Sequence, residues 1–131
     1  MLRRSRPTGP DPETVATVIV RDGGCCVVCG EPLSGFRGRD WSIHHRRGRD
    51  GKPDSHQPQN LMAVCGGDNT AGCHGRIHRR RSEAEPNGWW ISRIAGTDPL
   101  TVPVLVDRES RWTYLTADGR MSDDPPEVAH A

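Results

Sequence analysis

Long apolar runs are absent from this 131-residue chain. A helix that spans a bilayer needs about 20 consecutive apolar residues, and no segment comes near that length. The first twelve residues, MLRRSRPTGPDP, also lack the apolar centre of a secretory signal peptide. From these two absences we expect a cytoplasmic protein with no membrane partner.

Apolar side chains are scarce overall, because they make up only 33% of the residues, whereas glycine contributes 15 and proline 11. A chain of this length forms one domain, and burial alone would struggle against the entropy lost when so many loop residues are ordered. Five cysteines lie between Cys25 and Cys73 and could supply the missing cross-links. Thiols stay reduced in the cytoplasm, so we interpret these cysteines as metal ligands rather than disulfides.

The formal net charge is only +1, which by itself says nothing about nucleic-acid binding. The basic residues are nevertheless concentrated, because ten of them face only four acidic residues between Arg37 and Arg81. From Ser82 onward the acidic residues outnumber the basic ones. A charge run is often no more than a solvated surface, but this one surrounds most of the histidines.

Local patterns predict both helices and strands. An Asp-Pro-Glu start at residues 11–13 predicts a helix of about ten residues that ends before the glycines at 23 and 24, with a strand as the alternative. Short extended segments are expected at 41–45 and 60–64, and a helix at 74–81. Further along, the sequence predicts strands at 89–94, 102–106 and 112–116.

Four of the cysteines fall into two pairs, Cys26-x-x-Cys29 and Cys65 with Cys73. Four thiolates are what a closed tetrahedral zinc site requires, and two intervening residues is the usual spacing of a zinc knuckle. Seven residues separate the second pair, three of them glycine, and such an insert can loop out without moving the ligands. Cys25 could replace Cys26, although the two-residue spacing favours Cys26. Since four thiolates leave no position for water, this zinc would be structural and would stabilise a domain with little core.

A second set of polar residues, His44, His45, Asn60, His74 and His78, is larger than zinc binding alone explains. In chain order, both sets lie in the segments Cys-Val-Val-Cys-Gly, Ile-His-His, Asn-Leu-Met-Ala-Val-Cys and Gly-Cys-His-Gly-Arg-Ile-His. These segments span residues 26–78, and their order resembles the HNH endonuclease family, in particular its small phage-encoded members. The resemblance implies the ββα-metal fold, in which two short strands and a helix surround one divalent ion.

The same resemblance implies a role for each residue. His45 would be the general base that deprotonates the attacking water, and Asn60 would position the loop that carries it. His44, His74 and His78 would bind the catalytic divalent cation, which could be Mg²⁺, Mn²⁺, Ni²⁺ or Zn²⁺ because imidazole also suits the softer ions. Neighbouring strand residues point to opposite faces, so we expect a bulge or a strand end at His44 and His45.

DNA is the expected substrate and partner. Arginines near the histidines are candidates for contacts with DNA phosphates: Arg46, Arg47, Arg49, Arg76, Arg79 and Arg80. Such contacts position DNA without reading it, so we expect low sequence specificity, with nicking and double-strand cleavage both open. Phage proteins of this family and size resemble partners of the terminase that packages DNA. Terminase subunits are therefore candidate partners, and the host cytoplasm is the expected location if a phage encodes the chain.

The alternative reading is a zinc-knuckle DNA-binding module without catalysis. It shares the four cysteines with the nuclease but gives His45 no chemical role.

The expected domain boundaries follow from these assignments. Residues 1–10 should form a disordered basic arm and residues 11–82 the HNH nuclease core with its zinc knuckle. Residues 83–120 should form a C-terminal β extension packed on the core, and residues 121–131 a disordered tail. The expected fold class is α+β: a small ββα-metal core with a structural zinc site, preceded by a short helix and followed by a few short strands.

Overall fold

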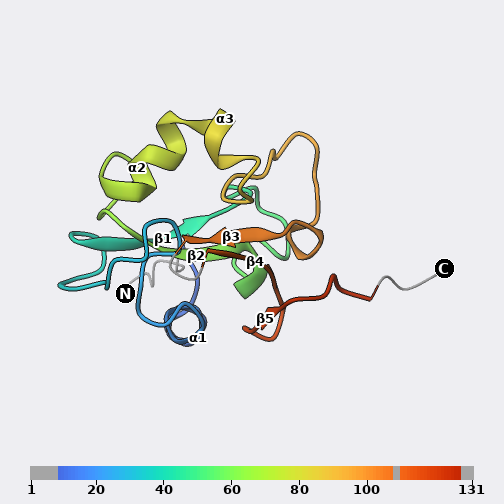
Figure 1. Ribbon diagram of the computed structural model, residues 1–131, viewed down its shortest axis with the longest axis horizontal. Helices are drawn as coiled ribbons and strands as arrows, with labels where there is room; N and C mark the ends of the chain where they lie inside the picture. The colour runs from blue at the N-terminus through green and yellow to red at the C-terminus, as the bar shows by residue number, and fades with distance from the viewer. Residues whose placement is uncertain (1–8, 108–109, 128–131) are drawn as a thin grey trace, which may run out of the picture.

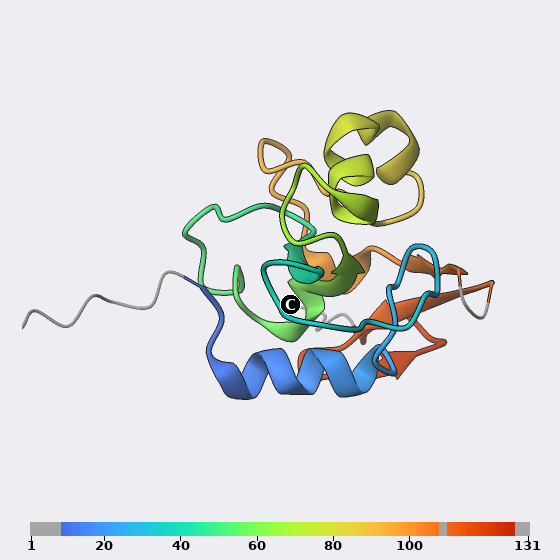
Figure 2. The same ribbon diagram turned by 90° about the vertical axis from the view of Figure 1, so that its left-hand side faces the viewer.

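The computed structural model describes residues 9–107 and 110–127. It is a small α+β structure with two antiparallel sheets. Its elements are α1 (Pro12–Arg21), β1 (Trp41–His45), β2 (Leu61–Cys65), α2 (Gly72–Arg79), α3 (Arg81–Ala84), β3 (Val104–Val106), β4 (Arg111–Leu115) and β5 (Met121–Ser122), with 3-10 turns at Pro58–Asn60 and Pro99–Thr101. In both views α1 lies on one side of the strands and α2 with α3 on the other (Figure 1, Figure 2). No helix within the described ranges is long and apolar enough to cross a membrane.

The predicted N-terminal helix is confirmed as α1. Asp11 caps its first turn by accepting a hydrogen bond of 2.8 Å from a backbone N–H three residues on. Val15 and Val18 are buried and pack in one cluster with Leu61 and Ala63 of β2. The helical period brings these two valines onto one stripe that faces the strand, which explains why a helix prevails over the strand that the valine content allowed.

β1 pairs with β2 in antiparallel register, from Trp41 opposite Cys65 to His45 opposite Leu61. Residues 61 and 63 belong to the cluster under α1, whereas residues 62 and 64 join the larger core with α2 and the C-terminal sheet. Residues 61–64 are fully buried, so elements cover both faces of this strand. His44 and His45 close β1, which is the strand end that the sequence led us to expect.

The C-terminal sheet has the order β3-β4-β5. Two of the three predicted strands are present, at β3 and β4. Residues 89–94 form no strand, and this prediction is wrong. The backbone N–H groups of Trp89 and Ile91 bond to the carbonyls of Ala84 and Arg46, which lie in different segments, so no single strand pairs with this stretch.

The expected boundaries of the ordered region also change. A disordered tail is predicted from residue 121, yet Met121–Ser122 form β5 and pair with the end of β4. A short strand of two residues leaves too little pattern in the sequence to be recognised. Residues 123–127 of the expected tail are described and form neither helix nor strand, whereas residues 128–131 and residues 1–8 of the expected arm lie outside the described residues.

Candidate metal centres

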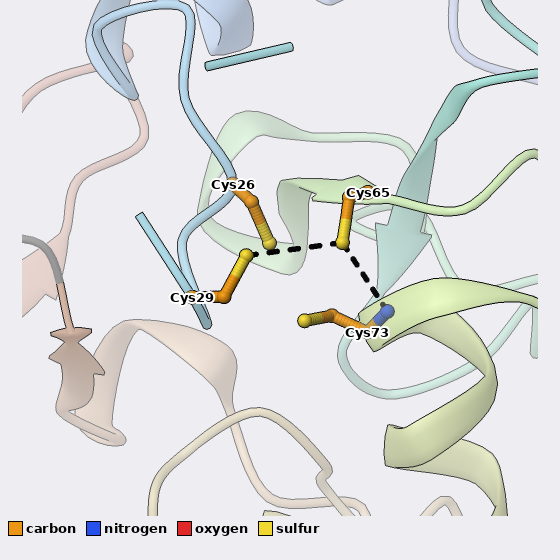
Figure 3. A group of neighbouring side chains, drawn as sticks. All are labelled: Cys26, Cys29, Cys65 and Cys73. Carbon is orange, nitrogen blue, oxygen red and sulfur yellow. Dashed lines mark hydrogen bonds between the residues drawn. The ribbon is translucent and has the colours of Figure 1, made fainter. Parts of the chain in front are cut away.

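Three separate segments bring four cysteines together (Figure 3). Cys26 and Cys29 lie in the turn after α1, Cys65 ends β2, and Cys73 lies in the first turn of α2. Their sulfur atoms all lie within 4.8 Å of one another, and those of Cys29 and Cys65 are 3.8 Å apart. Tetrahedral zinc with Zn–S bonds of about 2.3 Å sets sulfur atoms about 3.8 Å apart. The group therefore fits a structural metal ion such as zinc. Cys25 is not part of the group, because its thiol points to the carbonyl of Gly23.

Glycines close the seven-residue gap between Cys65 and Cys73. Gly66 and Gly72 both adopt positive φ angles, at 98° and 56°. A Cβ at Gly66 would lie 1.9 Å from the carbonyl oxygen of Ala71, so only glycine allows the loop to fold back this tightly. The loop returns so closely that the backbone N–H of Cys73 donates to the sulfur of Cys65 at 3.3 Å.

Hydrogen bonds and burial shift the pKa values of the thiols in this group. A hydrogen bond from Cys73 is the largest of the effects that lower the pKa of the Cys26 thiol to about 5. Burial raises the pKa of Cys29 to about 11, and the hydrogen bond with Cys26 raises the pKa of Cys73. Metal ligation requires thiolates, so a cation at the centre would displace protons from this group when it binds.

Three histidines form a second group. His44 comes from β1, and His74 and His78 lie one turn apart on α2. One nitrogen of each ring lies within 4.8 Å of the others, and the ring centroids are 5.1 to 5.6 Å apart. His44 is fully buried, whereas the other two are partly exposed. The three rings are close enough to hold one metal ion on adjacent coordination positions.

Hydrogen bonds fix which nitrogen of His44 is available. Its Nε2 lies 2.6 Å from the backbone carbonyl of Trp89. A carbonyl can only accept, so this nitrogen carries the proton and Nδ1 keeps its lone pair. Metal-bound histidines commonly donate their second ring N–H to a backbone carbonyl, which orients the ring. His44 has this arrangement.

A serine fixes which ring nitrogen of His74 is available. The hydroxyl of Ser42 lies 2.6 Å from the carbonyl of Gly66 and 2.7 Å from Nδ1 of His74. Ser42 has a single proton, which it must donate to the carbonyl, so Nδ1 of His74 is the donor in the second hydrogen bond. Nε2 of His74 is left with a free lone pair, the form that binds a metal.

All three rings are held neutral. Burial is the largest cause that lowers the pKa of His44 far below its usual range, that of His74 to about 4, and that of His78. The mutual repulsion of the three rings, if charged, adds to the effect at His44. Neutral imidazole is the form that coordinates metals, so this group is prepared for an ion at neutral pH.

The histidine group opens into a pocket of about 290 Å³. His45, Arg49 and Trp90 line this pocket beside the three histidines. The Nε2 atom of His45 lies 2.9 Å from Nδ1 of His56. Burial, followed by the charge of Arg49, lowers the pKa of His45 to about 4. At neutral pH the ring of His45 is therefore uncharged.

Asn60 is fully buried behind His45. Its side-chain carbonyl accepts from the backbone N–H of Arg47 at 2.9 Å, and its amide donates to the carbonyl of Ser55 at 3.0 Å. The side chain thus ties together the two ends of the loop that follows His45.

Two of the arginines expected to contact phosphates are buried instead. Arg46 is 0% exposed and Arg47 is 2% exposed. Arg46 donates to backbone carbonyls, and Arg47 pairs with Asp50 and Asp54. Their donors are used inside the protein, so the expectation that they contact DNA is wrong. The remaining candidates are exposed: Arg49, Arg76, Arg79 and Arg80.

Sequence reasoning did not identify two residues of the site, His56 and Ser42. His56 lies in a polar loop without a recognisable motif, and a serine at a strand position carries no signal of its role. Both are found only when the fold sets them beside a histidine.

No protein-family model, curated protein or solved structure matches this chain. A functional conclusion therefore has to come from the two side-chain groups themselves.

Proposed function

We propose that this protein is a metal-dependent DNA endonuclease of the HNH type. The observation that supports it best is the pocket in which His45 lies beside three neutral histidines with converging ring nitrogens. The order β1, β2, α2 around these residues also resembles the ββα arrangement of that family. A basic group next to a cation site is what hydrolysis of a phosphodiester requires.

His45 acts as general base in this proposal. Its neutral ring takes a proton from a water molecule, whose oxygen then forms a bond to phosphorus while the bond from phosphorus to the 3′ oxygen breaks. A divalent cation bound by His44, His74 and His78 would neutralise charge on the phosphoryl oxygens and on the departing oxygen. Asn60 holds the loop behind His45 and so keeps the base in place.

The ligand set favours some cations over others. Three neutral imidazoles provide nitrogen donors without negative charge, and the group contains no carboxylate from the described residues. Mg²⁺ prefers carboxylate and water oxygens and Mn²⁺ shares much of this preference, whereas Ni²⁺ and Zn²⁺ bind imidazole well. Activity should therefore be higher with these transition metals than with Mg²⁺.

In this proposal, exposed arginines in the pocket and along α2 provide the contacts to DNA. Arg49 lines the pocket itself. Arg79 and Arg80 are exposed at the end of α2, the helix that carries two of the histidines, and Arg76 is exposed one turn earlier. Such side chains bind phosphates without reading bases, so cleavage should show low sequence specificity.

Cleavage of supercoiled plasmid tests the proposal. The wild type, His45→Ala and His45→Gln are first freed of any cation in the histidine group while zinc is kept in the cysteine group. Each protein is then assayed after separate addition of Mg²⁺, Mn²⁺ or Ni²⁺. We expect nicking or linearisation by the wild type and a loss of about 10²- to 10⁴-fold in both variants. Circular dichroism and zinc content of the variants serve as controls for folding.

Two other outcomes would change the conclusion. If the wild type binds DNA but cleaves it with none of the cations, the alternative of a non-catalytic zinc-knuckle module is favoured. The exposed arginines and the cysteine group already provide what such a module needs. If cleavage occurs only when terminase subunits are added, the protein is a nuclease that works inside the packaging machinery. Equal cleavage by His45→Ala would refute the role of the base.

A further inference from the structure

His56 stands directly behind the base of the proposed nuclease. Its Nδ1 lies 2.9 Å from Nε2 of His45, and the two rings meet edge to face with centroids 5.0 Å apart. His45 lines the pocket, whereas His56 is not among the lining residues. The pair therefore has one member that can meet the substrate and one that supports it.

Only one proton lies between the two rings, and its position decides what His45 can do. If His56 donates, His45 must carry its own proton on Nδ1 and has no lone pair left to accept another. If His45 donates from Nε2, its Nδ1 keeps a lone pair and can accept a proton from water. The base of the proposed reaction requires the second arrangement.

The loop that carries His56 is held at several points. Asn60 ties the backbone of Arg47 to that of Ser55, the residue before His56. Arg47 pairs with Asp50 and Asp54 inside the same loop. These contacts hold the loop in the conformation that brings His56 against His45.

We propose that His56 is a positioning residue for His45: it accepts the hydrogen bond from Nε2–H and holds His45 in the tautomer whose Nδ1 is the proton acceptor. After proton transfer, the same hydrogen bond stabilises the charged ring of His45, because the acceptor nitrogen is in place without rearrangement. This inference rests on the proposed function for its catalytic consequence, but the tautomer itself is a property of the folded protein.

Two substitutions of His56 distinguish the effect of losing the hydrogen bond from an effect on folding. His56→Leu removes the acceptor, whereas His56→Asn keeps an oxygen acceptor close to the position of Nδ1. The tautomer of His45 is measured in the full-length, zinc-containing protein by long-range ¹H–¹⁵N NMR with ¹⁵N-labelled histidine, with the His45 signals assigned from their loss in His45→Gln. Plasmid cleavage at saturating metal gives kcat and KM for each variant.

We expect the wild type to carry the His45 proton on Nε2. In His56→Leu this preference should be lost and kcat should fall about 10- to 100-fold with KM unchanged, as for other partners that orient a functional histidine. His56→Asn should stay within about 3-fold of the wild type, since the acceptor is retained. A His45 protonated on Nδ1, or an unchanged tautomer and kcat in His56→Leu, would refute the inference.

Failure of the proposed function gives a different result. If the wild type cleaves no DNA with any cation, the nuclease is refuted, yet the NMR measurement still decides whether His56 sets the tautomer of His45.

Discussion

Arg46 offers the most direct test of how this small protein is held together. The guanidinium is fully buried and donates to four backbone carbonyls, those of Gly88, Gln59, Pro99 and Val102, over 2.7 to 3.1 Å. Burial lowers the pKa of Arg46 to about 9, so the group remains charged at neutral pH. A single side chain thus connects the end of β1 to the loops before β2 and β3.

Replacement of Arg46 by methionine keeps the apolar stem and removes all of these donors. Each buried carbonyl left without a partner costs about 1–3 kcal/mol, and part of this is offset because a charge no longer has to be buried. We therefore expect the free energy of unfolding to fall by about 3–5 kcal/mol, with Arg46→Lys intermediate because it restores some donors.

Guanidinium chloride unfolding followed by tryptophan fluorescence, at saturating zinc, measures this change. Arg80→Met is the matched control, because Arg80 is exposed and its ion pair with Glu83 is long at 3.8 Å. The control should stay within about 0.5 kcal/mol of the wild type in stability and weaken DNA binding instead. If Arg46→Met were within about 1 kcal/mol of the wild type, the carbonyl network would not stabilise the fold as argued.

Two further predictions concern the metal groups. Cys29→Ala, or removal of zinc by a chelator, should unfold the protein, because a structural zinc contributes on the order of 10 kcal/mol; far-UV circular dichroism should show the loss, and an unchanged spectrum would contradict it. Ser42→Ala should lower the affinity of the histidine group for Mn²⁺ or Ni²⁺ by about 10- to 100-fold, because His74 loses the acceptor that fixes its tautomer. Calorimetry measures this affinity, with Ser92→Ala as the control. Equal affinities would contradict this role.

Local patterns were sufficient to predict most of the secondary structure. α1 follows from an Asp-Pro start and a valine stripe, and β1 and β2 follow from two short extended segments, whereas the two-strand arrangement was expected only through the resemblance to the HNH family. The strand predicted at 89–94 is wrong because Trp89 and Ile91 are buried individually while Ile94 is fully exposed, and apolar composition alone does not say whether a neighbouring strand exists.

The candidate site was predictable only in part. The four cysteines are recognisable because their spacing along the chain matches the geometry of a zinc site, whereas His74 and His78 were assigned only through the resemblance to the HNH family. Arg46 and Arg47 were misassigned because the charge of a residue says nothing about whether carbonyls and carboxylates will surround it. His56 could not be found at all, since its relation to His45 depends on how a ten-residue loop closes.

The two candidate metal groups lie on shared or neighbouring elements. Cys73 and His74 are consecutive residues of α2, and Cys65 ends the strand that pairs with the one holding His44. α2 has only eight residues, and isolated helices shorter than about 12–15 residues are marginal in water. Its position must therefore come from tertiary contacts, among them the cysteine group at its first turn. In the proposed enzyme, zinc bound by the cysteines would hold α2 where His74 and His78 meet His44, so occupancy of the structural site would control assembly of the catalytic one.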